Sequence, residues 1–309
     1  MRSWSKSSLE KLDTCGWRFK LRYIDGLDEP ASWNMETGTA VHAAVEAHES
    51  ERLRWWASRG AEGDREGLHL DALRMLAEEH TEAKRHDLPD EHDYEDGRPF
   101  TFETATEAAW RALEAWWHAP IPKGQPGEGG SLRDRAMAWR PVAFEPRFRV
   151  WVPDVAPRPL LGFIDGLYLD LETGEFVEVD YKIALKLDGW KKDGKGKRLQ
   201  PTLYGAASPL APNLPVRATP RFEYHVMRYA QGKNANFQAV RVIPINVDEL
   251  DREWVDGKVR AAEERLAAGD FTPNPDSNLC SPRWCPHYAA PGSPCPARPE
   301  GYTEGSATM

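Results

Sequence analysis

The most constraining feature of this 309-residue chain is a segment of alternating apolar and charged residues at 176–183 (FVEVDYKI). From Val177 onward the apolar side chains occupy odd positions, whereas Glu178, Asp180 and Lys182 occupy even ones. Successive side chains of a β-strand point to opposite faces of the sheet. The segment is therefore predicted to be a strand with one apolar face and one face carrying two carboxylates and an ammonium group.

The preceding segment, residues 160–170, is predicted to be a neighbouring strand in which Asp165 is the only charge on an otherwise apolar face. A carboxylate in such a position must be neutralised, hydrogen-bonded or bound to a metal. If the two strands pair, Asp165 and Asp180 can share one Mg²⁺, which prefers a few carboxylates plus waters and phosphate oxygens. Lys182 could then orient a water or neutralise developing charge. The alternative is a structural Asp–Lys pair.

The periodicity of the remaining chain predicts an α/β or α+β layer architecture, of which we expect the α/β class. Helices are expected at 5–23, 37–54, 68–85, 102–118, 200–207 and 247–268, and further strands at 142–152, 221–228 and 237–245. We expect one domain over residues 1–309, with a helical insertion or cover at 50–140 and a cysteine-rich tail at 270–309.

Hydrophobic residues make up 40% and charged residues 29% of the chain, which permits a packed core. The first residues contain no apolar signal-peptide segment, and no apolar run approaches the roughly 20 residues of a membrane span. A cytoplasmic protein without a membrane partner is therefore expected.

The net charge of −9 argues mildly against nucleic acid as a partner, although local patches decide affinity for phosphate. Basic residues do gather directly after the predicted catalytic strand. This group is either a solvated loop or a phosphate-guiding, nucleic-acid-binding segment, and it comprises Lys186, Lys191, Lys192, Lys195, Lys197 and Arg198.

Several motifs in sequence order resemble one known family. Residues 162–166 (GFIDG) and 179–182 (VDYK) resemble the "G-x-I-D … V-D-Y-K" signature of RecB-like PD-(D/E)XK nucleases. Residues 38–42 (GTAVH) are similar to the family's G-x-x-x-H segment, residues 200–204 (QPTLY) to its Q-x-x-x-Y motif, and residues 5–27 to its opening helix. Glu145 occupies the place of a frequent glutamate on the first core strand.

The resemblance implies a restriction-endonuclease-like core, in which helices flank a central mixed β-sheet, with an N-terminal helical region and a cysteine-bearing tail. It implies a Mg²⁺- or Mn²⁺-dependent DNA exonuclease that acts on single-stranded DNA or DNA ends, in recombination, repair or phage DNA metabolism. The implied metal ligands are His42, Asp165, Asp180 and the Tyr181 carbonyl. Catalytic roles are implied for Asp165, Asp180, Lys182, Gln200 and Tyr204.

Other interpretations of these residues stay open. His42 can be a structural histidine, and Gln200 and Tyr204 can simply pack and hydrogen-bond locally. The whole chain can be a non-catalytic nucleic-acid-binding or scaffold module that keeps the nuclease fold. No G-x-x-x-x-G-K-[ST] loop is present, so any unwinding of DNA would need a separate helicase or recombination protein.

The four cysteines are Cys15, near the start, and Cys280, Cys285 and Cys295 in the tail. Four thiolates can ligate a 4Fe-4S cluster or a zinc ion, but the paired C-x₂-C spacing of zinc knuckles is missing. The arrangement resembles that of iron–sulfur RecB-like nucleases, such as the AddB nuclease domain and the CRISPR-associated four-cysteine nucleases. That resemblance implies a 4Fe-4S cluster, and four unliganded cysteines are the alternative.

Overall fold

The computed structural model describes residues 1–29, 31–59, 67–88, 101–152, 156–184, 187, 190, 198–229, 239–277, 279–281, 285–288 and 295–296. The chain divides into two compact units. The first comprises Met1–Pro30, Phe148–Gly162 and Asp248–Met309, and the second comprises Ala31–Arg147 and Phe163–Val247. The expected single domain at 1–309, cover at 50–140 and tail at 270–309 stay predictions.

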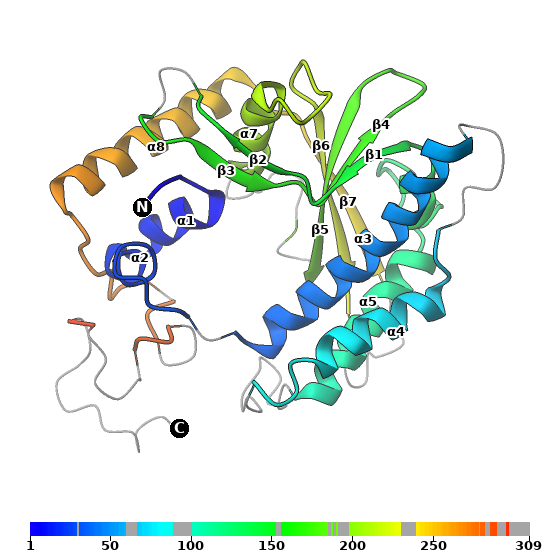
Figure 1. Cartoon of the computed structure of the whole chain (residues 1–309), viewed down its shortest axis with the longest axis horizontal. Helices are drawn as coiled ribbons and strands as arrows, with labels where there is room; N and C mark the ends of the chain where they lie inside the picture. Colours follow the sequence, from blue (N-terminus) through cyan, green and yellow to red (C-terminus); the bar gives the residue numbers. More distant parts are fainter. Residues whose placement is uncertain are drawn as a thin grey trace. The chain divides into compact units, whose positions relative to one another are not determined.

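The second unit is built on a five-stranded mixed sheet (Figure 1). Its strand order is β1 (Arg140–Phe144), β4 (Gly166–Leu169), β5 (Phe176–Ala184), β6 (Arg221–Arg228) and β7 (Ala239–Ile245). β5 and β6 run parallel, and the other neighbouring pairs are antiparallel. The expected α/β class with a central mixed sheet is confirmed.

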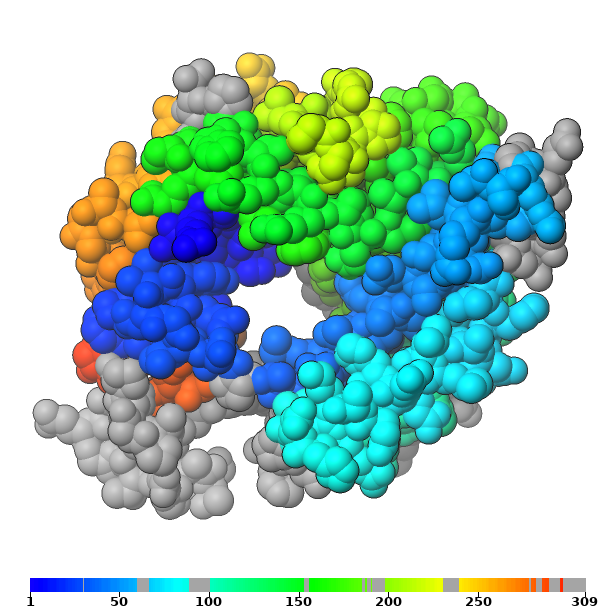
Figure 2. Space-filling model, in the orientation of Figure 1, coloured from blue at the N-terminus to red at the C-terminus, as the bar shows by residue number. Residues whose placement is uncertain are grey.

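One face of this sheet packs against helices α3 (Trp33–Arg59) and α5 (Phe102–His118). Helix α4 (Leu70–Glu82) packs on α3 and α5, α6 (Leu132–Met137) packs on α5, and all four helices share one apolar cluster with the sheet. α5 begins at Thr101, whose side chain caps the helix, and turns a row of small alanines toward the core, which allows close approach. Val177, Val179 and Tyr181 of β5 lie in the same apolar cluster. In Figure 2, α3 (blue) and α4 (cyan) lie side by side on the surface of this unit.

The opposite face of the sheet carries a smaller apolar cluster from β6 and β7, against which Tyr204 of α7 (Leu199–Ala207) packs. A 3₁₀ turn, Ser208–Leu210, follows α7 directly. Pro201 lies in the first turn of α7, where backbone N–H groups have no intrahelical acceptor, so the ring removes no helical hydrogen bond.

The first unit contains two helices near the N-terminus, a two-stranded sheet and a long helix. These elements are α1 (Lys6–Thr14), α2 (Gly16–Tyr23), β2 (Arg147–Val150), β3 (Leu160–Phe163) and α8 (Glu249–Ala268). α8 begins at its capping residue Asp248 and ends at Gly269, whose left-handed φ of 66° closes the helix.

Three elements differ from the sequence expectation. The helix expected at 5–23 is two helices, because the backbone of Cys15 is extended (φ −162°, ψ 111°). The strands expected at 142–152 and 160–170 are each broken, and their halves belong to different sheets. The predicted shared apolar face of residues 161–169 is accordingly wrong: Phe163 is 47% exposed, whereas Leu167 is fully buried. Among the described helices, none combines the length and apolarity of a membrane span.

The charged face of β5 is as predicted, but Glu178 on that face is completely buried. Burial raises the pKa of Glu178 to about 8, and a hydrogen bond with Ser208 lowers it only in part. The folded protein therefore holds a proton on this carboxyl that an unfolded chain, with the ordinary value of 4.5, would release.

Replacing this carboxyl should change how stability depends on pH. Because the folded-state pKa of Glu178 is raised, the stability that its protonated form contributes is fully present below about pH 4. That contribution to the free energy of unfolding is lost progressively as the pH rises to about 8. Glu178→Gln should remove that loss, on the order of a few kcal/mol in the free energy of unfolding. Urea unfolding of both proteins at pH 5 and pH 8.5 measures it.

The matched control is Glu172→Gln, which changes an exposed carboxyl in the turn before the same strand. It should keep the parent's pH dependence. Identical pH dependence in the parent and Glu178→Gln would show that Glu178 is ionised in the folded protein.

Candidate functional site

The site is built around the break between β3 and β4. β4 pairs with β5 only from Gly166, which lies opposite Val179, so the ladder ends just before Asp165. The peptide groups of Tyr181 therefore have no β4 partner among the paired residues. The side chain of Asp165 takes over one of them, since the Tyr181 N–H donates to Asp165 Oδ2 at 2.9 Å.

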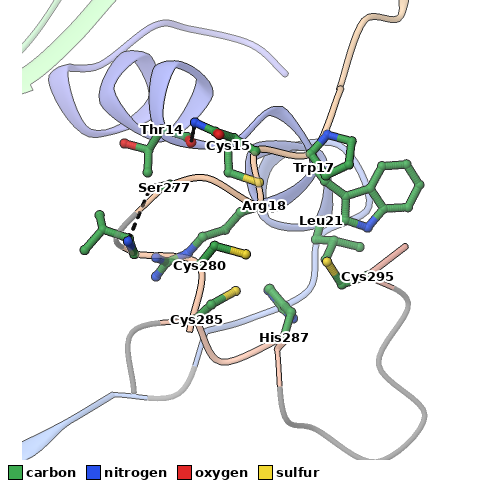
Figure 3. A pocket seen from close by; sticks show the side chains of 13 residues that line it. Thr14, Cys15, Trp17, Arg18, Leu21, Ser277, Cys280, Cys285, His287 and Cys295 are labelled. Carbon is green, nitrogen blue, oxygen red and sulfur yellow. Dashed lines mark hydrogen bonds between the residues drawn. The ribbon is translucent and has the colours of Figure 1, made fainter. Parts of the chain in front are cut away.

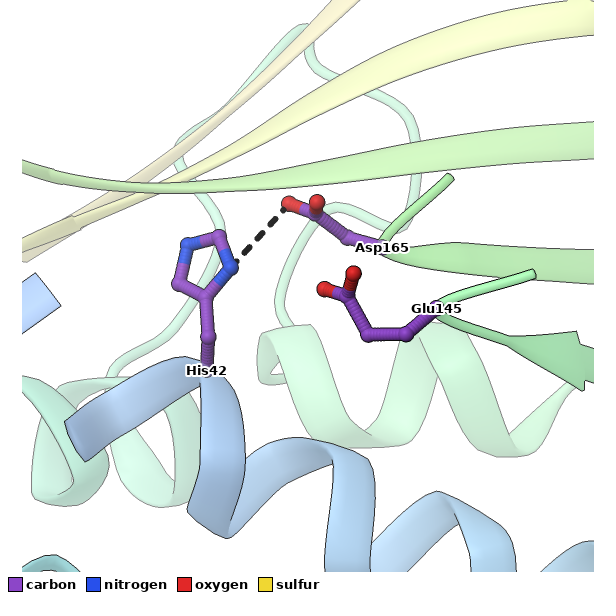
Figure 4. Close-up of side chains that lie close together, drawn as sticks. All are labelled: His42, Glu145 and Asp165. Carbon is purple, nitrogen blue, oxygen red and sulfur yellow. Dashed lines mark ion pairs between the residues drawn. The ribbon is translucent and has the colours of Figure 1, made fainter. Parts of the chain in front are cut away.

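His42 of α3 takes over the other peptide group. Its Nε2 lies 2.8 Å from the Tyr181 carbonyl oxygen, and because a carbonyl can only accept, Nε2 carries the hydrogen. In the neutral ring the lone pair of Nδ1 then faces Asp165 Oδ2 at 3.4 Å (Figure 4). Two electron-rich atoms face each other, so the gap favours a proton or a metal cation.

Electrostatics agree with this geometry at Asp165. Burial, and then the negative charge of Asp180, raise the pKa of Asp165 to about 7, although His42 and Lys182 act in the opposite direction. Two carboxylates in one partly desolvated place disfavour ionisation of both unless a cation compensates them. A shift of this origin is typical of functional sites.

Glu145 is the third member of the group. One donor atom each from His42, Glu145 and Asp165 lie within 4.8 Å of one another, and Figure 4 shows the three side chains converging. Glu145 follows β1 directly, in a left-handed conformation with φ 46°, and its N–H faces the Asp165 carbonyl at 3.4 Å. Burial raises the pKa of Glu145 as well. Such backbone strain in a non-glycine residue is tolerated mainly at functional sites.

Asp180 lies beside this group with both carboxylate oxygens engaged. Lys182 Nζ contacts Oδ2, and Gln200 Nε2 donates to Oδ1. Asp180 is 3% exposed, so these two partners replace water. The three-residue donor set therefore contains Glu145 in place of Asp180, whereas no ligand role was predicted for Glu145. The signal that could have found it is its position directly after the first core strand.

Tyr204 is one helical turn beyond Gln200 on α7 and hydrogen-bonds to the backbone of Phe163. Burial, followed by the charges of Asp180 and Asp165, raises its pKa above the ordinary range. The site thus brings together His42, Asp165, Asp180, Tyr181, Lys182, Gln200 and Tyr204.

The basic segment is only partly described. Arg198 lies at the start of α7 and donates to the Asn246 carbonyl at 3.2 Å. The five lysines of that prediction, Lys186, Lys191, Lys192, Lys195 and Lys197, lie outside the described residues.

A second candidate site lies in the first unit. Cys15, Cys280, Cys285 and Cys295 line one pocket, together with Arg18 and His287 (Figure 3). Cys15 is at the junction of α1 and α2, and the other three come from the tail. The Asn274 side chain donates to the Thr14 carbonyl at 3.1 Å, and Phe271 stacks on Phe19, so the tail is tied to both helices before the cysteines begin.

The spacing of the sulfurs bears on what they can hold. Across the described residues, the group of His42, Glu145 and Asp165 is the one set of three possible donors within 4.8 Å of one another, so no three thiol sulfurs are that close. Tetrahedral zinc, with Zn–S bonds of about 2.3 Å, holds its sulfurs roughly 3.8 Å apart. A four-iron cluster interposes a larger core between its four cysteines.

Comparison with known proteins places the chain. A family model of the PD-(D/E)XK nuclease superfamily matches residues 3–290. Solved structures that match include a protein described as "Putative exonuclease" from Eubacterium rectale, with 10% identity, a TM-score of 0.52 and coverage of 95% of this chain and 91% of that one. At this identity the likeness shows the fold alone. A search of curated proteins gave no match.

The family match spans nearly the whole chain, and the acidic group, the Lys182–Asp180 pair and His42 lie together in the second unit. Nucleases of this superfamily use divalent metals, for which the group of His42, Glu145 and Asp165 offers a possible site. The chain belongs to the PD-(D/E)XK nuclease superfamily.

Proposed function

We propose that this protein is a Mg²⁺- or Mn²⁺-dependent DNA exonuclease of the RecB-like group, acting on single-stranded DNA or DNA ends. The observation that carries the proposal is the convergence of His42, Asp165 and the Tyr181 backbone around one point, with Lys182 beside it. Recombination, repair or phage DNA metabolism is the proposed setting, with a separate helicase or recombination protein as a partner.

The residues divide the chemical work between them. His42, Asp165, the Tyr181 carbonyl and either Glu145 or Asp180 would hold the cation. A divalent cation bound there stabilises charge on the phosphate and makes a bound water more acidic. Lys182 lies where its ammonium group can orient that water and neutralise charge on the scissile phosphate. Gln200 holds Asp180, and thereby Lys182, in position.

The DNA substrate and the exonuclease mode have separate support. The basic segment that follows Lys182 in sequence supplies several cations that could bind a phosphate backbone. The structural neighbour from Eubacterium rectale carries the description of an exonuclease. An enzyme that needs a free end would degrade linear strands and spare closed circles.

The nuclease prediction is tested with labelled linear and circular single-stranded DNA of one sequence. With Mg²⁺ or Mn²⁺ the parent should degrade the linear strand, and EDTA should stop it. Lys182→Met and Asp180→Asn should each lower the rate by about a hundredfold or more. The first removes the ammonium group that would neutralise charge on the phosphate, and the second removes the carboxylate that holds Lys182 and can bind the cation. Lys123→Met, which removes an exposed lysine, should match the parent.

The outcomes separate the alternatives. Binding of DNA without cleavage in either metal would mean a non-catalytic binding module. Cleavage of circular strands at the same rate as linear ones would replace the exonuclease mode with an endonuclease mode.

A binding measurement tests the role of Glu145 in the metal site. Glu145→Gln should weaken Mn²⁺ binding about tenfold or more, as removal of a metal-site carboxylate does. Electron paramagnetic resonance of free Mn²⁺ measures this without reference to cleavage. Glu79→Gln changes an exposed helix carboxyl and should leave the affinity unchanged. If Glu145→Gln binds Mn²⁺ as tightly as the parent and Asp180→Asn binds it more weakly, the carboxylate ligand is Asp180 and not Glu145.

We also propose that Cys15, Cys280, Cys285 and Cys295 hold a 4Fe-4S cluster, which would tie the tail to the N-terminal helices. The support is the pocket that all four cysteines line. The expected task is structural, since no group of the acidic centre belongs to this unit.

Anaerobic purification tests the cluster directly. The parent should carry about four iron atoms per chain and absorb visible light, and Cys15→Ser or Cys295→Ser should lose both. His287→Gln is the matched control, because His287 lines the same pocket but is not one of the four ligands. A colourless parent that binds zinc stoichiometrically would exclude the cluster. Loss of iron in His287→Gln but not in Cys295→Ser would mean that His287, and not Cys295, is the fourth ligand.

A further inference from the structure

An ion-pair chain lies against the four-cysteine pocket and has no part in the proposed nuclease chemistry. Arg18, on α2, lines the pocket with the cysteines (Figure 3). Its guanidinium binds Glu29 through two hydrogen bonds, Nε to Oε1 at 2.8 Å and Nη2 to Oε2 at 3.1 Å. Lys11 Nζ binds the same carboxylate at 2.5 Å.

The ion-paired group of Lys11, Glu29 and Arg18 is largely shielded from water. Its three side chains are between 17% and 19% exposed, unlike the neighbouring surface pair of Arg22 and Asp28, at 38% and 91%. Burial works against ionisation of Glu29, but the hydrogen bonds from Arg18 and Lys11 lower its pKa to about 2. Burial lowers the pKa of Lys11, and the carboxylate of Glu29 acts in the opposite direction. With Arg18 and Lys11 protonated, two positive charges against one negative charge leave one net positive charge.

The positive charge of Arg18 favours the thiolate form of a neighbouring cysteine, Cys285. Burial raises the pKa of the Cys285 thiol, whereas a backbone hydrogen bond at His287 and the positive charge of Arg18 lower it. Interactions with Cys285 and Cys15 act in turn to raise the pKa of Arg18. Arg18 thus faces one thiol from the junction of α1 and α2 and one from the tail, the two segments that a bound group would join.

A site of four thiolates needs such a charge. A 4Fe-4S cluster with four cysteine ligands is an anion in both of its common redox states, and one-electron reduction adds a further negative charge. Burying an anion without a compensating charge is costly, whereas a fixed cation nearby favours the more negative state. Net charge and hydrogen bonds near the sulfurs are among the factors that set a cluster's potential.

We propose that Arg18, held in place by Glu29 and Lys11, is the positioning residue that compensates the negative charge of the four-cysteine site and raises the reduction potential of the group bound there. This inference rests on the proposed cluster and is independent of the proposed nuclease activity. Arg18 contributes a fixed charge and is not a ligand.

The test compares reduction potentials in the full-length protein, reconstituted anaerobically with iron and sulfide and titrated with dithionite, which supplies the electron. Arg18→Gln should lower the midpoint potential relative to the parent, because the reduced state loses its compensating charge. Arg18→Lys should lie close to the parent. Arg22→Gln removes the same charge from the exposed side of the same helix and should leave the potential unchanged.

A variant that does not bind the cluster has no measurable potential, so the iron content of each variant is measured as well. Iron uptake by Arg18→Lys but not by Arg18→Gln also supports the proposal, since the first variant keeps the positive charge and the second removes it. Failure of both variants to load would make Arg18 a structural residue, and equal potentials in Arg18→Gln, Arg22→Gln and the parent would show that its charge does not reach the site; either result overturns the proposal. A parent without iron overturns it as well, and leaves the metal-dependent cleavage of DNA to be decided by its own assay.

Discussion

The acidic centre depends on the early end of one β-ladder. Because β4 starts only at Gly166, the peptide of Tyr181 is left for other partners, and the side chains of Asp165 and His42 occupy its two polar groups. A backbone group this poorly hydrated must find a partner. The chain before Gly166 leaves the β4–β5 ladder, and this both frees the peptide of Tyr181 and places the side chain of Asp165 beside it. Interruption of the sheet and assembly of the centre are thus one structural event, and this explains why strained and buried charged groups gather there.

Local sequence patterns predicted much of this fold. The alternation at residues 176–183 identified β5 and its charged face, and most helices lie where apolar periodicity placed them, because their buried faces follow from side chains close in sequence. The breaks after Phe144 and Phe163 were missed for a physical reason. Both flanking segments alternate like one strand, and their division between two sheets depends on partners far away in the chain.

The candidate site was predictable in part for the same reason. Sequence motifs selected Asp165, Asp180, Lys182 and His42, and the structure brings them together in one unit. Local patterns could not predict that Gln200 would engage Asp180, or that Glu145 would turn toward His42 in a left-handed conformation. The first contact joins two different elements, and the second depends on a backbone conformation that residue type alone does not specify.

The contribution of Tyr181 has a consequence for genetics. Its phenol ring belongs to the apolar core, where its hydroxyl meets that of Tyr168 at 2.6 Å, whereas its carbonyl oxygen faces His42. A saturation screen at this codon would report packing defects and never delete the oxygen, since all twenty amino acids carry it. No substitution can remove the carbonyl oxygen of Tyr181. Only a change of the backbone itself, such as an amide-to-ester exchange, would measure how much this oxygen contributes.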